Sequence, residues 1–91
     1  MISVATLNKI SKILKDEGCD EIFLFGSQLT GKANSNSDID IGIKGLHPSR
    51  FFSVYSRLDS EIEENIDFVD FDEQASFYTF LCSIGEIKKI G

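Results

Sequence analysis

The sequence predicts an α/β fold in which helices pack on a small β-sheet. Short apolar runs of strand length occur at residues 21–25, 38–44 and 66–71. Segments with apolar residues at helical spacing lie before, between and after them. Because the two kinds of segment alternate along the chain, they are expected to form one layered unit.

The size of the chain limits what it can contain. Its 91 residues suit a single domain spanning 1–91. No apolar run approaches the roughly 20 residues that a membrane-spanning helix needs, and the first residues do not resemble a signal peptide, so we expect a cytoplasmic protein with no membrane partner. A domain this small buries a limited core, which favours a protein partner or a homo-oligomer.

The charge of the chain is acidic, with a formal net charge of −6. Eight of its 15 Asp and Glu residues fall between positions 59 and 73, where there is no Lys or Arg. Such a domain repels a phosphate backbone, so we expect no extended nucleic acid as a partner. A single nucleotide bound through a metal ion remains compatible, because the ion inverts the local charge.

The first half of the chain predicts a helix, a strand and a turn. Residues 3–16 form an amphipathic pattern that ends at Gly18. The strand at 21–25 shows no alternation, so we expect a central strand covered on both faces. A turn at Gly26, a short helix at 27–31 and a polar loop up to residue 37 follow.

The second half predicts two more strands, each followed by a helix. The strand at 38–44 leads to a helix that begins at Pro48 and is closed by Asn65. The strand at 66–71 leads to a helix at 73–84, and residues 86–90 form an extended tail. The apolar set expected on the last helix comprises Ala75, Phe77, Phe80, Leu81 and Ile84.

Two aspartates open the second strand. Asp38 and Asp40 are two residues apart, so on a strand they project from one face. Transfer of a phosphoryl or nucleotidyl group builds negative charge that divalent ions stabilise, and Mg²⁺ prefers carboxylate oxygens. The pair therefore predicts a metal site, with a solvated strand start as the alternative.

The turn at Gly26 and Ser27 predicts a phosphate site. A glycine lets the backbone approach a phosphate closely, and backbone N–H groups and a serine hydroxyl can donate to it. The alternative is that Ser27 only caps the short helix that follows.

The motif residues together resemble a known family. Gly26-Ser27, Gly31 and Ser37-Asp38-Ile39-Asp40 resemble the G-S-x-x-x-G and S-D-x-D motifs of the DNA polymerase β-like nucleotidyltransferase superfamily. The small size resembles its minimal nucleotidyltransferase (MNT) branch, whose members are often encoded beside a HEPN-domain protein, in several cases as the antitoxin of a toxin–antitoxin pair. The resemblance implies a nucleotidyltransferase fold with a small mixed sheet.

The resemblance also implies site residues. Asp38 and Asp40 would hold two Mg²⁺ ions, and a third carboxylate would bind one ion and activate the attacking hydroxyl. Asp67 is our choice because it opens its strand, where the family places an acid before an apolar run. Asp70 is the alternative, and by parity it faces the opposite way, as a solvent-facing or strand-end residue.

Nucleotide contacts are implied for Gly26, Ser27, Gln28 and Lys32. Many family members carry Arg where this chain has Gln28, so its triphosphate site lacks one cation. Lys32 is a candidate to replace that charge, and Lys44 is another.

The function implied is transfer of a nucleotide, AMP from ATP, to a hydroxyl of a HEPN-domain partner. The alternative is an inactive binding module that neutralises its partner by complex formation. The nucleotide base, the acceptor and the oligomeric state are left open by the sequence.

Overall fold

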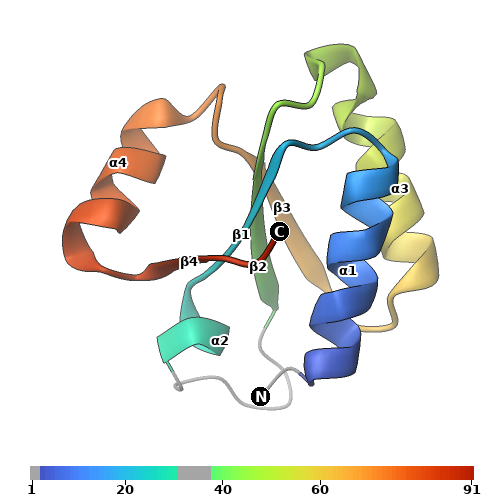
Figure 1. The fold of residues 1–91 in the computed structure, drawn as a ribbon, viewed down its shortest axis with the longest axis horizontal. Helices are drawn as coiled ribbons and strands as arrows, with labels where there is room; N and C mark the ends of the chain where they lie inside the picture. Colours follow the sequence, from blue (N-terminus) through green and yellow to red (C-terminus); the bar gives the residue numbers. More distant parts are fainter. Residues whose placement is uncertain (1–2, 31–37) are drawn as a thin grey trace.

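The computed structural model describes residues 3–30 and 38–91, and in it one sheet lies between two layers of helix (Figure 1). The strands are in the order β3-β2-β1-β4. In chain order the elements are α1 (Val4–Asp16), β1 (Glu21–Phe25), α2 (Ser27–Thr30), β2 (Ile39–Lys44), a 3-10 turn (Pro48–Arg50), α3 (Phe51–Glu61), β3 (Ile66–Asp70), α4 (Ala75–Ile84) and β4 (Ile87–Lys89). The predicted α/β class with a small mixed sheet is confirmed.

The sheet mixes both kinds of pairing. β1 is antiparallel to β2 and to β4, whereas β2 and β3 are parallel and joined through the crossover helix α3. The apolar strand β1 is central, as its lack of alternation predicts, and four of its five residues are buried. The extended tail forms the edge strand β4.

One face of the sheet is covered by α1 and α3 (Figure 1). Helix α1 starts at the cap Ser3, whose side chain accepts a hydrogen bond from the Thr6 N–H at 3.1 Å. The core on this face combines alternate residues of the strands with the inner stripes of both helices: Ile10, Leu14, Ile22, Leu24, Ile39, Ile41, Ile43, Val54 and Leu58.

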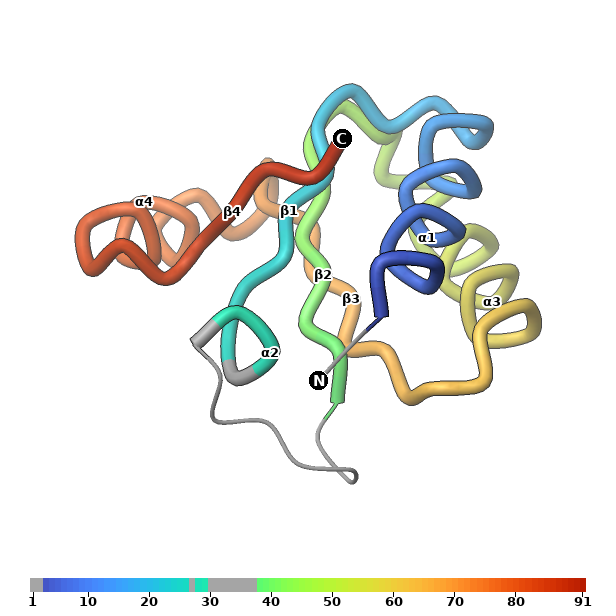
Figure 2. The backbone as a smooth tube through the Cα atoms, turned by 60° about the horizontal axis from the view of Figure 1, so that its bottom comes forward, coloured from blue at the N-terminus to red at the C-terminus, as the bar shows by residue number. Residues whose placement is uncertain are grey.

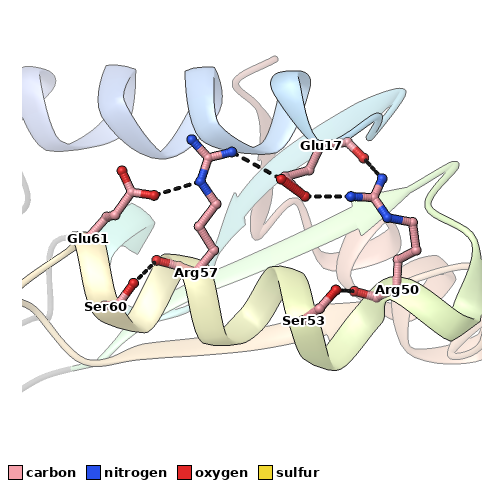
Figure 3. Close-up of polar contacts among 6 residues, drawn as sticks. All are labelled: Glu17, Arg50, Ser53, Arg57, Ser60 and Glu61. Atoms are coloured by element: carbon pink, nitrogen blue, oxygen red, sulfur yellow. Dashed lines mark hydrogen bonds and ion pairs between the residues drawn. The ribbon is translucent and has the colours of Figure 1, made fainter.

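An ion-pair bridge joins these two helices. Glu17, at the end of α1, accepts from Arg50 at 2.6 Å and from Arg57 at 3.1 Å (Figure 3). Arg57 also pairs with Glu61 one turn along α3 at 2.6 Å. These side chains are partly exposed, so the bridge fixes the helix orientation more than it adds stability.

Among the helices that the structure describes, α4 covers the opposite face. Its inner residues Phe77, Tyr78 and Leu81 pack on an aromatic cluster with Phe23, Phe25 and Phe71. Ring centroids in this cluster lie 5.3–6.1 Å apart in tilted and edge-to-face pairs, the arrangement that aromatic quadrupoles favour.

The predicted apolar set of α4 is wrong in part. Phe80 and Ile84 are 56% and 46% exposed, and Tyr78 packs on the sheet in their place. A short helix over a sheet buries one stripe, here residues 77, 78 and 81, so a second apolar stripe is left outside.

Other boundaries also differ from the predictions. Helix α3 ends at Glu61 rather than at Asn65, because Ile62 adopts an extended conformation and its side chain enters the core.

Within the part of the chain that the structure describes, no helix is long and apolar enough to cross a bilayer.

Candidate active site

Asp40 lies on the face of the sheet that α4 covers. Its neighbours Ile39 and Ile41 point into the core under α1 and α3. Because side chains alternate along β2, Asp40 and Gly42 point to the other face. Asp38, directly before the strand, shares the parity of Asp40 and is exposed.

Asp67 is the direct partner of Asp40 in the parallel β2–β3 pair. It shares its parity with Val69, which packs on the aromatic cluster under α4, so both carboxylates occupy one face. Burial, then the charge of Asp67 and then that of Asp38 raise the pKa of Asp40 from its ordinary value of 3.8 to about 6. The structure thus brings the three predicted aspartates into one electrostatic cluster.

Asp70 belongs to the other face and has a structural role. Its carboxylate accepts hydrogen bonds from the N–H groups of Asp72 at 2.9 Å and Glu73 at 3.4 Å. Asp70 is the last residue of β3, as the strand-end expectation has it. It is not solvent-facing, because only 6% of it is exposed. These bonds close the turn between β3 and α4.

Gly26 contacts the Asp40 carboxylate. It follows Phe25, the partner of Asp40 in the antiparallel β1–β2 pair, and has a φ of +74°. A Cβ on Gly26 would lie 2.1 Å from Asp40 Oδ2. Glycine is therefore required twice here, for its backbone conformation and for this close approach.

Of the other predicted nucleotide contacts, the structure describes the side chain of Gln28 but not those of Ser27 and Lys32. Gln28 lies in α2 and is enclosed by the protein, with 8% exposed. Ser27 starts α2, but its side chain lies outside what the structure describes, and so do Lys32 and the motif residues Gly31 and Ser37.

Lys44 does not compensate for the charge missing at Gln28. It lies four residues beyond Asp40 on β2, which separates them by about 13 Å. Its ammonium group instead lies 3.7 Å from the centroid of the Tyr78 ring, in a cation–π contact.

The aspartate cluster suits a hard divalent cation in its donor chemistry. Carboxylate oxygens are the ligands that Mg²⁺ prefers, and Mg²⁺ keeps several waters, so few protein ligands are needed. A cation would also relieve the repulsion that raises the pKa of Asp40. Among the described residues no three His, Cys, Asp or Glu side chains already converge as a set of ligands.

Sequence reasoning missed what surrounds Asp40. The Gly26 backbone touches it, and the buried Phe25 ring stands beside it on the same face. The signal was present in the order of the chain, since Phe25 and Gly26 end the strand that pairs with β2. The register that joins them to Asp40 depends on packing between the two strands.

The fold is that of a nucleotidyltransferase. Residues 8–87 match the model of the family "Polymerase beta, Nucleotidyltransferase", so the chain belongs to that family. Within the family the chain is a minimal nucleotidyltransferase, as its similarity to solved MNT–HEPN complexes shows.

Several similar solved structures are toxin–antitoxin complexes. A crystal structure of a toxin–antitoxin with AMP-PNP is 31% identical with a TM-score of 0.72, over 91% of this chain and 70% of that one. The toxin–antitoxin MntA-HepT is 27% identical with a TM-score of 0.67, over 96% of this chain and 70% of that one. A tri-AMPylated Shewanella oneidensis HEPN toxin in complex with MNT antitoxin is 29% identical with a TM-score of 0.63, over 93% of this chain and 68% of that one. Comparison with curated protein sequences found no match.

Proposed function

We propose that this protein is a Mg²⁺-dependent enzyme that transfers AMP from ATP to a hydroxyl of a partner protein. The observation that carries the proposal is the pairing of Asp40 with Asp67 on one sheet face, beside Asp38 and the Gly26 turn. Membership of the nucleotidyltransferase family supports the reaction class.

Each aspartate has a separate role in this proposal. Asp38 and Asp40 hold two Mg²⁺ ions, and Asp67 holds one of them. When bound, Mg²⁺ neutralises charge on the triphosphate and on the oxygens that attack and leave. The backbone at Gly26 and Ser27 contacts the phosphates of ATP, and Gln28 and Lys32 complete the nucleotide site.

The transfer balances as a single substitution at phosphorus. The acceptor hydroxyl oxygen forms a bond to the α-phosphorus of ATP while the bond from that phosphorus to the α–β bridging oxygen breaks. Pyrophosphate leaves, and the hydroxyl proton passes to Asp67, which is exposed beside Asp40. The product is an adenylylated partner.

The partner proposed is a HEPN-domain toxin, with this chain as its antitoxin. The similar solved structures support this, since they are toxin–antitoxin complexes and one contains a tri-AMPylated HEPN toxin. The complex with AMP-PNP supports ATP as the nucleotide.

A binding module without catalysis is the second candidate, and Gln28 favours it. The residue after Gly-Ser carries no charge in this chain, and it is buried rather than open to a ligand. A triphosphate would then be held with one cation fewer than the resemblance implies. Such a module would neutralise its partner by contact alone.

Intact-protein mass spectrometry separates the two candidates. The purified chain is mixed with ATP, Mg²⁺ and the cognate HEPN-domain protein, and the partner is weighed. We expect the partner to gain one or more AMP units with the wild type and none with Asp38→Asn. Asp59→Asn, which removes an exposed acid on α3, is the matched control and keeps the activity. A complex that forms without any mass gain would favour the binding module.

A further inference from the structure

Helix α4 lies on the surface but carries no charged residue. None of the residues from Ala75 to Ile84 is Asp, Glu, Lys or Arg. The other two long helices expose charged side chains: Lys9, Lys12, Lys15 and Asp16 on α1, and Asp59 and Glu61 on α3. A surface helix of a free-standing domain normally has such a polar face, so α4 is the exception among the three long helices that the structure describes.

The outward side of α4 presents two large apolar groups. Phe80 and Ile84 are one turn apart, so their side chains lie on one stripe, and both are exposed. The other exposed residues of α4 are small and uncharged. We call this surface the outer face of α4, and it comprises Ser76, Thr79, Phe80, Ser83 and Ile84.

This outer face lies on the same side of the sheet as the aspartates. Phe25 is the strand partner of Asp40, and its ring packs edge-to-face against Phe77 of α4 with centroids 5.6 Å apart. Figure 2 shows α4 on one side of the strands and both α1 and α3 on the other. A protein seated on α4 is therefore on the side from which the carboxylates are approached.

We propose that the outer face of α4 is the docking surface for the acceptor protein and fits an uncharged, apolar surface on it. This inference rests on the proposed function, because it names where the acceptor is held. A charged group of the partner would lose its hydration against Phe80 and Ile84 without gaining a counter-charge, so the matching surface is apolar. The two side chains act as anchors of a larger interface, since a stable one buries about 800 Å² on each partner.

A second copy of this chain is the other occupant that the surface could take. It is disfavoured by charge, because each copy carries a net charge of −6 and two copies repel each other.

The test compares four exposed apolar residues in one binding assay. Phe80→Glu and Ile84→Glu alter the outer face of α4, whereas Val4→Glu on α1 and Phe52→Glu on α3 are the matched controls. Val4 and Phe52 are 73% and 80% exposed and lie on helices that cover the opposite sheet face. The dissociation constant for the cognate HEPN-domain protein is measured by calorimetry without nucleotide, and circular dichroism checks the fold of each variant.

We expect each α4 variant to bind the HEPN-domain protein about tenfold more weakly or worse, and both controls to bind like the wild type. Binding of ATP and Mg²⁺ stays unchanged in all four variants. Equal binding by the α4 variants, equal losses in the controls, or no binding by the wild type would overturn the proposal. A wild-type dimer that Phe80→Glu dissociates would instead assign the surface to a second copy.

Failure of docking is distinguishable from failure of the proposed function. If the wild type binds but never adenylylates the partner, and the α4 variants still lose binding, the proposed docking surface is supported and the proposed transferase activity is not. If the wild type adenylylates and the α4 variants do so with an unchanged KM for the partner, the docking surface falls and the transferase stands.

Discussion

Asp40 and Asp67 face each other across the parallel β2–β3 pair, on the sheet face that α4 covers. The charge of Asp67, added to partial burial, opposes ionisation of Asp40. The free protein therefore holds its carboxylates together at a cost in stability, which a bound cation would offset.

The pH dependence of stability should report this cost. The pKa of Asp40 is about 6 in the folded protein and near 3.8 when unfolded, so between these values the folded state binds more protons. The free energy of unfolding then falls as the pH rises from about 4 to about 6. Asp40→Asn should remove most of this fall. At pH 7.5 its free energy of unfolding should exceed that of the wild type by about 1 kcal/mol, a value reduced to allow for solvent screening of a partly exposed group.

Urea unfolding at a series of pH values measures this effect, with Asp59→Asn as the control. An Asp40→Asn variant that is less stable than the wild type at pH 7.5 would contradict the assigned repulsion. The same variant should lose AMP transfer, so that stability and activity change in opposite directions.

Mg²⁺ and nucleotide should stabilise the wild type in a way that depends on the aspartates. With Mg²⁺ and a non-hydrolysable ATP analogue at about tenfold their dissociation constant, we expect the melting temperature to rise by about 5–10 °C. EDTA should reverse the rise, and Asp38→Asn should abolish it. Differential scanning fluorimetry gives the values, and an equal rise in the Asp38→Asn variant would place the ion elsewhere.

Substitutions at Asp67 and Asp70 should affect different properties, the activity in the first case and the stability in the second. Asp67→Asn should reduce AMP transfer at least about 100-fold and keep the fold, since Asp67 is exposed. Asp70→Ala should cost about 1–3 kcal/mol, because it leaves the N–H groups of Asp72 and Glu73 without their acceptor. Activity and chemical denaturation, measured on both variants, check the pair. A stable, inactive Asp70→Ala variant would reverse the assignment.

Gly42 should not tolerate a side chain. A Cβ there would lie 2.0 Å from Phe71 Cε2, so Gly42→Ala forces the ring out of the aromatic cluster at a cost of about 1–3 kcal/mol. In the double variant Gly42→Ala, Phe71→Leu the cost should be less than additive, because the smaller side chain gives room. Gly85→Ala is the control: nothing lies within 4 Å of its added Cβ, and only its φ of +71° is strained, at about 1 kcal/mol. Thermal unfolding of these three variants and of Phe71→Leu alone tests both the ranking and the additivity.

Much of the candidate site could be read from local patterns. The two-residue spacing of Asp38 and Asp40 places them on one face of any strand, and the apolar run before Gly26 marks a central strand that ends in a turn. What the patterns left open was which acid of the next strand joins them. Strand parity separated Asp67 from Asp70, but the choice between them came from the family resemblance.

Local patterns in the sequence were enough to predict the order of helices and strands, the shared face of Asp38 and Asp40, and the position of the Gly26 turn. These depend on periodicity and backbone preference, which act over a few residues. Three features emerge only from the folded chain: Asp67 is the strand partner of Asp40, Gly26 touches the Asp40 carboxylate, and Phe80 and Ile84 remain exposed. Strand register and the choice of buried stripe follow from packing between distant segments, and no local pattern specifies them.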